Sequence, residues 1–389
     1  LVIVIGVLAA FKAFGFVLDN IKRFIPYDGL QSIPDWNLIA PLGISFYSFM
    51  MISYLVDLYN GRISAQKNFF RYLSYVLYFP HVTQGPIARY EEVGYQLWEE
   101  HSFNMDTIMR GVWLMLWGFV KKIVIADRIG AFTKEIFGHT FDYHGGIFLA
   151  VGIAYSIQIY CDFSGCMDIV RGTSECFGIV LGENFRRPYF SQTLPEFWRR
   201  WHLSLGAFFR EYVFYPVSTS KLFLKLNVKI RDHLGNVIGK VFAASIPILC
   251  VWVLTGLWHG AHLNFLLWGL GLFAVLVVEK LWLKKYLDRW PVLGHLYMLV
   301  LIPVSWAVFS VSDFGQLGAY FGRLFPLFSR TAAAYPLDFL KYGKTYGVFL
   351  ILGLLCSTSL PAYLYRRLKG TWLGAIILAV LFWLCLYCL

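Results

Sequence analysis

Charged residues are scarce in this chain and make up 15% of its 389 residues, against about a quarter in soluble domains. Hydrophobic residues make up 58%. A soluble protein cannot bury that much apolar surface, so lipid must cover part of it. The composition therefore excludes a disordered chain, a coiled coil and a collagen-like fibre, and it predicts an all-α polytopic membrane protein.

Several catalytic motifs are also missing. The sequence has no HExxH zinc motif, no Gly-rich phosphate loop and no G-x-S-x-G nucleophile elbow, which argues against a zinc hydrolase and against covalent serine catalysis. Its seven cysteines lie mostly in apolar runs, and we interpret them as small buried hydrophobic residues. We expect no bound metal.

Basic residues outnumber acidic ones by 34 to 23, for a net charge of +11. They gather in short clusters between apolar runs, as topology determinants and anionic-lipid contacts do, rather than in a nucleic-acid-binding stripe. The basic, aromatic-rich segment 183–240 is the longest of these regions. We place it on the cytoplasmic side and expect no nucleic-acid partner.

Long apolar runs predict the membrane spans, because a helix needs about 20 apolar residues to cross a bilayer. Counting short and tilted segments, we expect roughly eight to ten. The shortest, 69–82, runs into prolines and glycines and predicts a re-entrant segment buried by protein. The remaining runs are 1–18, 36–59, 107–125, 145–160, 241–258, 263–278, 296–311, 346–360 and 372–389.

The chain opens on an apolar run at Leu1, with no charged region before it and no cleavage site after it. That pattern is not typical of a signal peptide. We interpret the run as a transmembrane helix cut at its start, and we expect one or more N-terminal helices to precede it.

Two histidines lie at the junction of two apolar runs, in the sequence Trp258-His259-Gly-Ala-His262-Leu-Asn264. Ionisable groups at membrane depth cost about 2.5–3.5 kcal/mol on insertion scales, so such a histidine needs a reason. Imidazole suits proton transfer near neutral pH. The alternative is a structural imidazole that hydrogen-bonds within the helix junction. We assign no role to His262.

A third histidine, His202, follows the aromatic and basic run Phe197-Trp-Arg-Arg-Trp201. On one continuous helix, Trp198, His202 and Leu205 share a side, while Arg199, Arg200 and Arg210 reach water or phosphate. An interfacial amphipathic helix would explain the arginines equally well.

Asp162, Asp168 and Arg171 form a third polar group inside an apolar context. Asp168 and Arg171 are three residues apart, so we expect them to pair. Both a structural polar cluster and a functional one fit this pattern.

Six motifs occur in a fixed order along the chain, and together they resemble the membrane-bound O-acyltransferase (MBOAT) family. The sequence is most similar to the bacterial branch of that family, whose members modify alginate and teichoic acid. The motifs lie at 41–47, 79–90, 158–171, 183–189, 197–204 and 257–261.

This resemblance implies a single membrane domain over 1–389, with short re-entrant or tilted helices around a central funnel. It makes His259 and His202 the expected catalytic residues, with His259 as general base. Together with the polar residues above, it makes the expected substrate-binding residues Trp198, Arg199, Arg200, Trp201, Asn264 and Asp162. No tightly bound cofactor is expected.

The reaction implied is acyl transfer from a cytoplasmic thioester, either acetyl-CoA or a phosphopantetheinyl carrier protein. Acetyl is the expected group, and a polysaccharide or cell-envelope polymer outside the cytoplasm is the expected acceptor. The expected partners are the lipid bilayer, an acidic acyl carrier protein and a secreted acyltransferase that relays the group. The expected location is the bacterial inner membrane.

Three alternatives remain open from the sequence. One is D-alanyl transfer to teichoic acid. A second is a transporter or flippase for a polar or lipid-linked solute, which also needs charges at membrane depth but usually has repeated halves. The third is a catalytically silent scaffold for a secreted enzyme, in which both histidines are dispensable.

Overall fold

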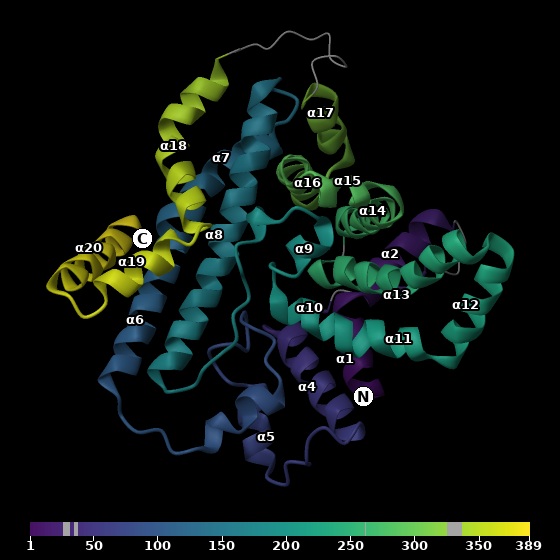
Figure 1. Ribbon diagram of the computed structural model, residues 1–389, viewed down its shortest axis with the longest axis horizontal. Helices are drawn as coiled ribbons and strands as arrows, with labels where there is room; N and C mark the ends of the chain where they lie inside the picture. Colours follow the sequence, from purple (N-terminus) through teal and green to yellow (C-terminus); the bar gives the residue numbers. More distant parts are fainter. Residues whose placement is uncertain (26–31, 35–37, 261, 325–336) are drawn as a thin grey trace. The chain divides into compact units, whose positions relative to one another are not determined.

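The computed structural model describes residues 1–25, 32–34, 38–260, 262–324 and 337–389 (Figure 1). Within these ranges the chain forms α-helices, with short π- and 3-10 helices between them and no strand. One isolated antiparallel bridge joins Phe185 and Trp201. The all-α fold class is confirmed.

The described chain divides into two compact units, each built from two stretches of sequence. The first unit comprises Leu1–Glu100 and Ser204–Lys284, and the second comprises His101–Leu203 and Lys285–Leu389. The sequence did not predict this division. The single domain over 1–389 remains a prediction.

The first unit contains the N-terminal helices and the segment that ends in the His259 junction. Its elements are α1 (Val2–Lys12), α2 (Phe14–Phe24), α4 (Ile44–Tyr59), α5 (Phe69–Val76), η1 (Tyr90–Gly94), η2 (Gln96–Trp98), α10 (Leu203–Phe209), η5 (Arg210–Phe214), α11 (Tyr215–Thr219), α12 (Lys221–Leu234), α13 (Asn236–His259), α14 (Leu263–Val278) and η6 (Glu279–Leu283). Its core includes the stacked rings of Phe49 and Phe208, whose centroids are 4.3 Å apart.

The second unit is built around the long helix α8 (Gly146–Cys176). Its other elements are α6 (Met105–Phe119), η3 (Val120–Ala126), α7 (Asp127–Gly138), η4 (Pro188–Phe190), α9 (Leu194–Trp198), α15 (Lys284–Arg289), α16 (Pro291–Ser310), α17 (Phe314–Leu324), α18 (Asp338–Cys356), α19 (Leu360–Leu368) and α20 (Trp372–Cys388). Helices α6 and α8 lie side by side (Figure 1). A Cβ on Gly118 would lie 2.5 Å from the carbonyl oxygen of Gly165, so only glycine allows this approach.

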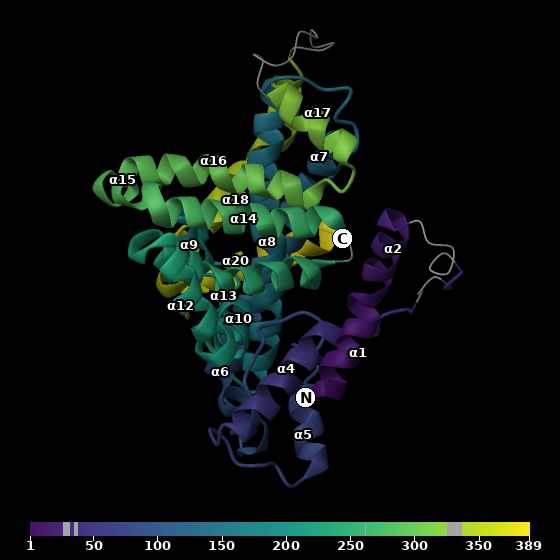
Figure 2. The same cartoon turned by 90° about the vertical axis from the view of Figure 1, so that its right-hand side faces the viewer.

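Among the described residues, five helices are long and apolar enough to cross a membrane. A sixth crossing exists if α1 and α2, which meet at a 53° bend, count as one broken span (Figure 2). The chain is thus a multi-pass membrane protein. The expected eight to ten segments included short and tilted ones, which are not among these five full-length helices. The five are Gly146–Cys176, Gly239–His259, Leu263–Arg289, Pro291–Ser310 and Asp338–Cys356.

Several expected spans are shorter or broken in the structure. The run 107–125 divides into α6 and the π-helix η3, and the run 69–82 contains only the eight-residue α5. Helices α4 and α20 are apolar but have 16 and 17 residues. For the run 36–59, apolar composition alone overestimated the length of the helix, because a turn at residues 42–43 delays its start. Residues 36 and 37 of the run 36–59 lie outside the described chain.

Candidate functional site

His259 is the last residue of α13, and its ring lies against aromatic rings of the first unit. The imidazole centroid is 4.6 Å from the Trp258 ring and 5.4 Å from the Trp268 ring, and both contacts are edge-on. Phe265 lies 6.1 Å away. An imidazole in this setting is partly shielded from water by bulky apolar rings, as a positioned proton acceptor requires.

Glycine allows α13 and α14 to pack closely beside this histidine. A Cβ on Gly256 would lie 2.7 Å from the carbonyl oxygen of Phe265, and one on Gly269 would lie 2.6 Å from that of Trp252. The two backbones therefore touch one turn before His259. Asn264 is 2% exposed in the first turn of α14, so the hairpin brings this expected binding residue and His259 into one unit.

His262 differs from His259 in its surroundings. It is exposed, precedes the first residue of α14, and its carbonyl oxygen accepts a hydrogen bond from the backbone N–H of Phe265. Position 261 lies outside the described residues. Of these two neighbouring histidines, His259 is thus partly buried and His262 is exposed.

His202 does not lie on a continuous helix with Trp198 and Leu205, and that expectation is wrong. Helix α9 ends at Trp198 and α10 begins at Leu203. His202, between them, has a φ of 46°, in the left-handed region that side chains rarely adopt. Local helix propensity gave way here because surrounding contacts fix the chain in a turn.

Backbone hydrogen bonds hold this turn in the second unit. The N–H of Leu203 donates to the carbonyl oxygen of Asn184 at 3.1 Å, and the N–H of Arg186 donates to that of Arg200 at 2.9 Å. The imidazole of His202 is 3% exposed and meets the ring of Phe163 edge-on, with centroids 4.7 Å apart. His202 is thus a buried residue in a fixed loop.

The other expected binding residues of this run lie in different environments. Trp201 is 4% exposed and stacks on Phe197 at 5.5 Å, while Trp198 is partly buried near Trp306. The guanidinium of Arg200 pairs with Glu196 at 2.6 Å, and Arg199 is exposed to solvent. Arg199 is therefore the better placed of the two arginines to meet an anionic ligand.

The carboxylates of α8 find partners that the sequence analysis missed. Lys121 donates to Asp168 at 2.6 Å and to Ser164 at 3.0 Å, and Lys122 pairs with Asp162 at 2.7 Å. The expected Asp168–Arg171 pair is present, at 3.7 Å. Two lysines inside the apolar run 107–125 were the available signal.

A second polar network was also missed, in the first unit. Asp57, 5% exposed near the end of α4, accepts hydrogen bonds from Tyr212 at 2.6 Å and from Arg62 at 3.1 Å. Asp57 is a lone carboxylate in an apolar run, and that isolation was the signal.

This network continues from Tyr212 to the adjacent Glu211. Arg89, whose guanidinium lies 5.9 Å from the Tyr212 ring centre, forms an ion pair with Glu211, and Arg62 lies 3.6 Å from the same carboxylate. Burial by itself lowers the pKa of Arg89, but the hydrogen bond to Glu211 outweighs it and the pKa is raised. Burial and the hydrogen bond to Asp57 raise the pKa of Tyr212. Both groups keep their protons at neutral pH and fix η5 to the segment before η1.

The two units therefore hold different parts of the predicted site. His259 and Asn264 belong to the first unit, and the remaining expected residues belong to the second. Within the described ranges, no group of three or more His, Cys, Asp or Glu side chains is placed to hold a metal ion. The members in the second unit are Asp162, Trp198, Arg199, Arg200, Trp201 and His202.

Known proteins resemble this chain over most of its length. The probable alginate O-acetylase AlgI of Pseudomonas syringae is 31% identical over 82% of this chain and 58% of its own. The peptidoglycan O-acetyltransferase of Helicobacter pylori is 28% identical over 79% and 60%. The teichoic acid D-alanyltransferase of Bacillus subtilis is 29% identical over 65% and 63%. The chain thus spans about three fifths of the length of these curated relatives.

A family model agrees with these relatives. Residues 38–230 match the model of the membrane-bound O-acyltransferase family. That region includes five of the six motifs that carried the resemblance, from position 41 to position 204. The chain belongs to the membrane-bound O-acyltransferase family.

Proposed function

We propose that this chain is an O-acyltransferase that transfers an acetyl group from a thioester to a hydroxyl of a polysaccharide or other cell-envelope polymer. The observation that carries the proposal is His259, which ends an apolar membrane helix between two tryptophan rings in a chain of this family. The printed functions of the relatives support the acceptor class, since alginate, peptidoglycan and teichoic acid are all envelope or extracellular polymers.

In the proposed mechanism, His259 acts as the general base. Its neutral imidazole accepts the proton of the acceptor hydroxyl while the hydroxyl oxygen attacks the thioester carbonyl carbon. The tetrahedral intermediate collapses, the C–S bond breaks, and the proton passes to the departing thiolate, so that an ester and a thiol form. General-base catalysis of this kind contributes typically about 10²–10⁴-fold.

The developing oxyanion needs hydrogen-bond donors. Indole N–H groups are donors only, and those of Trp258 and Trp268 belong to the rings next to His259. We propose that these two indoles or the amide of Asn264 stabilise the oxyanion. His202 is proposed as a second catalytic histidine, an assignment supported by the motif that contains it.

The donor is proposed to approach from the cytoplasmic side, where segment 183–240 supplies positive charge. Exposed lysines on α12 and exposed Arg199 suit the phosphate of coenzyme A or an acidic carrier protein. The acceptor side is proposed to face out of a bacterial inner membrane, where a secreted partner receives the acyl group or the polymer itself does.

The test is acetyl transfer from labelled acetyl-CoA and from an acetyl-carrier protein, in membranes with wild type, His259→Ala or His262→Ala at matched expression. His262 is the matched control, because it is an exposed histidine three residues away. We expect His259→Ala to lose about 10²–10⁴-fold of the rate and His262→Ala to keep it.

Equal transfer by wild type and His259→Ala would overturn the role of His259. A D-alanyl-carrier protein serves as a further donor, because the Bacillus subtilis relative is a D-alanyltransferase. Transfer of D-alanine without transfer of acetate would replace the proposed acyl group. No transfer from any donor, with retained uptake of a polar solute, would favour the transporter alternative.

A further inference from the structure

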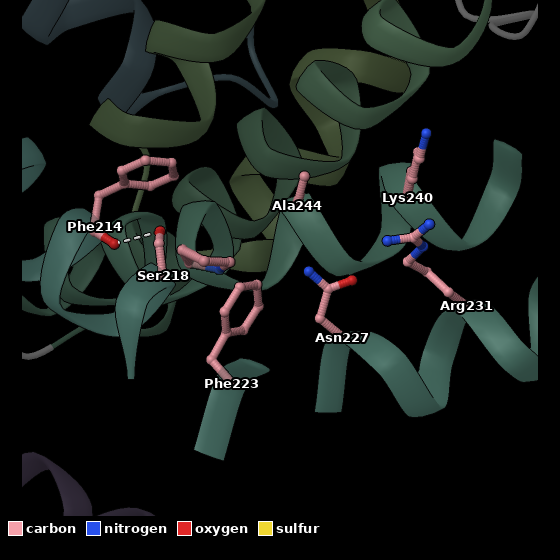
Figure 3. A pocket seen from close by; sticks show the side chains of 8 residues that line it. Phe214, Ser218, Phe223, Asn227, Arg231, Lys240 and Ala244 are labelled. Atoms are coloured by element: carbon pink, nitrogen blue, oxygen red, sulfur yellow. Dashed lines mark hydrogen bonds between the residues drawn. The ribbon is translucent and has the colours of Figure 1, made fainter. Parts of the chain in front are cut away.

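A cavity of about 220 Å³ lies in the first unit between α11, α12 and α13 (Figure 3). One water needs about 10–15 Å³ of such space, so the cavity has room for a group much larger than water. The argument uses six of its lining residues: Phe214, Ser218, Phe223, Asn227, Arg231 and Lys240.

The sequence builds this cavity as a helical hairpin. Phe223, Asn227 and Arg231 are four residues apart, so they share one face of α12. Gly235, with a φ of 74°, turns the chain between α12 and α13. A Cβ on Gly239 would lie 2.8 Å from the Cα of Arg231, so the two helices touch beside the turn.

The lining of the cavity divides into a polar end and an apolar end. Figure 3 shows the guanidinium of Arg231 extending toward the amide of Asn227, with Lys240 rising from α13 beside them. Phe214 and Phe223 line the opposite end. The hydroxyl of Ser218 donates to the carbonyl oxygen of Phe214 at 2.6 Å, so it is engaged with the end of η5.

Charge at the polar end favours an anion. Arg231 and Lys240 bring two positive charges, and no acidic residue is found among the described residues that line the cavity. A guanidinium and an ammonium beside an amide N–H₂ match the three-oxygen geometry of a phosphate better than a single neutral group. The aromatic end suits an apolar substituent on that phosphate.

The location of α12 indicates where such a ligand comes from. Helix α12 leads into the membrane-spanning part of α13 and exposes both apolar and basic side chains. Leu222 is 79% exposed and Val228 is 59% exposed, beside the exposed Lys225 and Lys229. A basic helix with exposed apolar residues is typical of the interface of an anionic membrane.

We propose that this cavity binds an anionic phospholipid, with its phosphate between Arg231, Asn227 and Lys240 and its glycerol and first acyl carbons against Phe214 and Phe223. The cavity lies mostly within segment 183–240, but its lining residues are distinct from those assigned above to the acyl-transfer step. It would anchor the α12–α13 hairpin, whose second helix ends in His259, at a fixed depth in the membrane.

The experiment measures binding of phosphatidylglycerol to the full-length chain in detergent micelles, by native mass spectrometry and by the rise in melting temperature on lipid addition. The cavity variant is Arg231→Gln with Lys240→Gln. Its matched control is Lys225→Gln with Lys229→Gln, which removes the same charge from exposed positions of α12 outside the cavity lining. We expect about tenfold weaker binding for the cavity variant, and nearly wild-type binding for the control.

Equal losses in the two double variants would show general charge attraction and overturn the proposal. Inorganic phosphate and phosphopantetheine, which lack acyl chains, are added as competitors. If either displaces phosphatidylglycerol at similar concentrations, the site serves a soluble phosphate ester and the lipid assignment is wrong. If the cavity variant fails to fold, Lys240→Gln alone decides, because Lys240 is exposed and its replacement leaves the helix packing intact.

Discussion

The two histidines singled out by the sequence lie in different units and on different kinds of backbone. His259 ends a regular helix and meets the rings of Trp258 and Trp268. His202 lies in a turn with a left-handed backbone. Backbone hydrogen bonds to the loop segment around Asn184 and Arg186 hold this turn. An apolar helix followed by glycine suffices to place the first, whereas only long-range contacts place the second.

The buried charges of the two units differ in a similar way. In the second unit, Lys121 is 4% exposed and pairs with Asp168 between two packed helices. In the first unit, Asp57 is buried, but the side chain of its partner Arg62 is 48% exposed. Both partners of the pair in the second unit are thus shielded from water, whereas only Asp57 is shielded in the pair of the first unit. We therefore expect different losses of unfolding free energy when the two pairs are broken.

The largest expected effect is that of Lys121→Met. Removing one partner of a buried ion pair costs about 3–5 kcal/mol of unfolding free energy, and we expect the lower end of that range because Arg171 stays 3.7 Å from Asp168. Lys122→Met is the matched control in the same π-helix, because Lys122 and its partner Asp162 are 36% and 40% exposed and such pairs contribute about 1 kcal/mol or less. Unfolding in detergent micelles measures both.

Arg62→Gln extends this comparison to the first unit. With half of the arginine side chain in solvent, we expect a loss of about 1 kcal/mol or less. A loss as large as that of Lys121→Met would contradict the difference between the two units.

A pH profile tests another buried histidine, His81, which lies between α5 and η1 outside the candidate spans. It is fully buried, and burial lowers its pKa to about 4. The pKa of a histidine in the unfolded chain is near 6.5. Between pH 6.5 and pH 4, His81 therefore binds a proton in the unfolded chain but not in the folded chain. Unfolding free energy should therefore fall by roughly 3 kcal/mol as the pH drops from 7 to 4.

His81→Gln isolates this contribution from other titrating groups. We expect the melting temperature of the variant to depend less on pH over that range than the wild type does. Parallel profiles for the two proteins would show that His81 is protonated without unfolding.

Alanine and glycine substitutions at the two site histidines should rank in opposite order. At His202, glycine adopts the left-handed backbone without strain, so His202→Gly should be more stable than His202→Ala by about 1 kcal/mol. At His259, a helical residue, His259→Ala should be the more stable by up to about 1 kcal/mol. The melting temperatures of the four variants measure this order. If alanine or glycine is the more stable choice at both positions, the two backbones do not differ as described.

The smallest effect is expected for Tyr212→Phe, which removes the hydroxyl that donates to Asp57 at 2.6 Å. We expect a loss of about 0.5 kcal/mol, the lower end for a single hydrogen bond, because Arg62 still compensates the charge of Asp57. Tyr59→Phe is the control, since Tyr59 is 91% exposed. Equal stability of the two variants would show that the Asp57 network adds nothing.

Part of the candidate site was predictable from the sequence and part was not. The His259 junction, the Asp168–Arg171 pair and the importance of the six motifs follow from residue order and spacing. The single helix through His202 was wrong, because backbone hydrogen bonds from Leu203 to Asn184 and from Arg186 to Arg200 override its local preference. The ion pairs of Lys121 and Lys122 were not predicted, because their partners lie about 40 residues further along the chain.

The sequence by itself determined the all-α fold class, the membrane location and the family. These follow from apolar run length and motif order, which are local properties that need no folded structure. The tertiary structure alone decided how many runs form full-length helices, which carboxylate each cation meets, and where the chain adopts left-handed backbone. Each of these depends on residues far apart in sequence, whose proximity is created only when the helices pack.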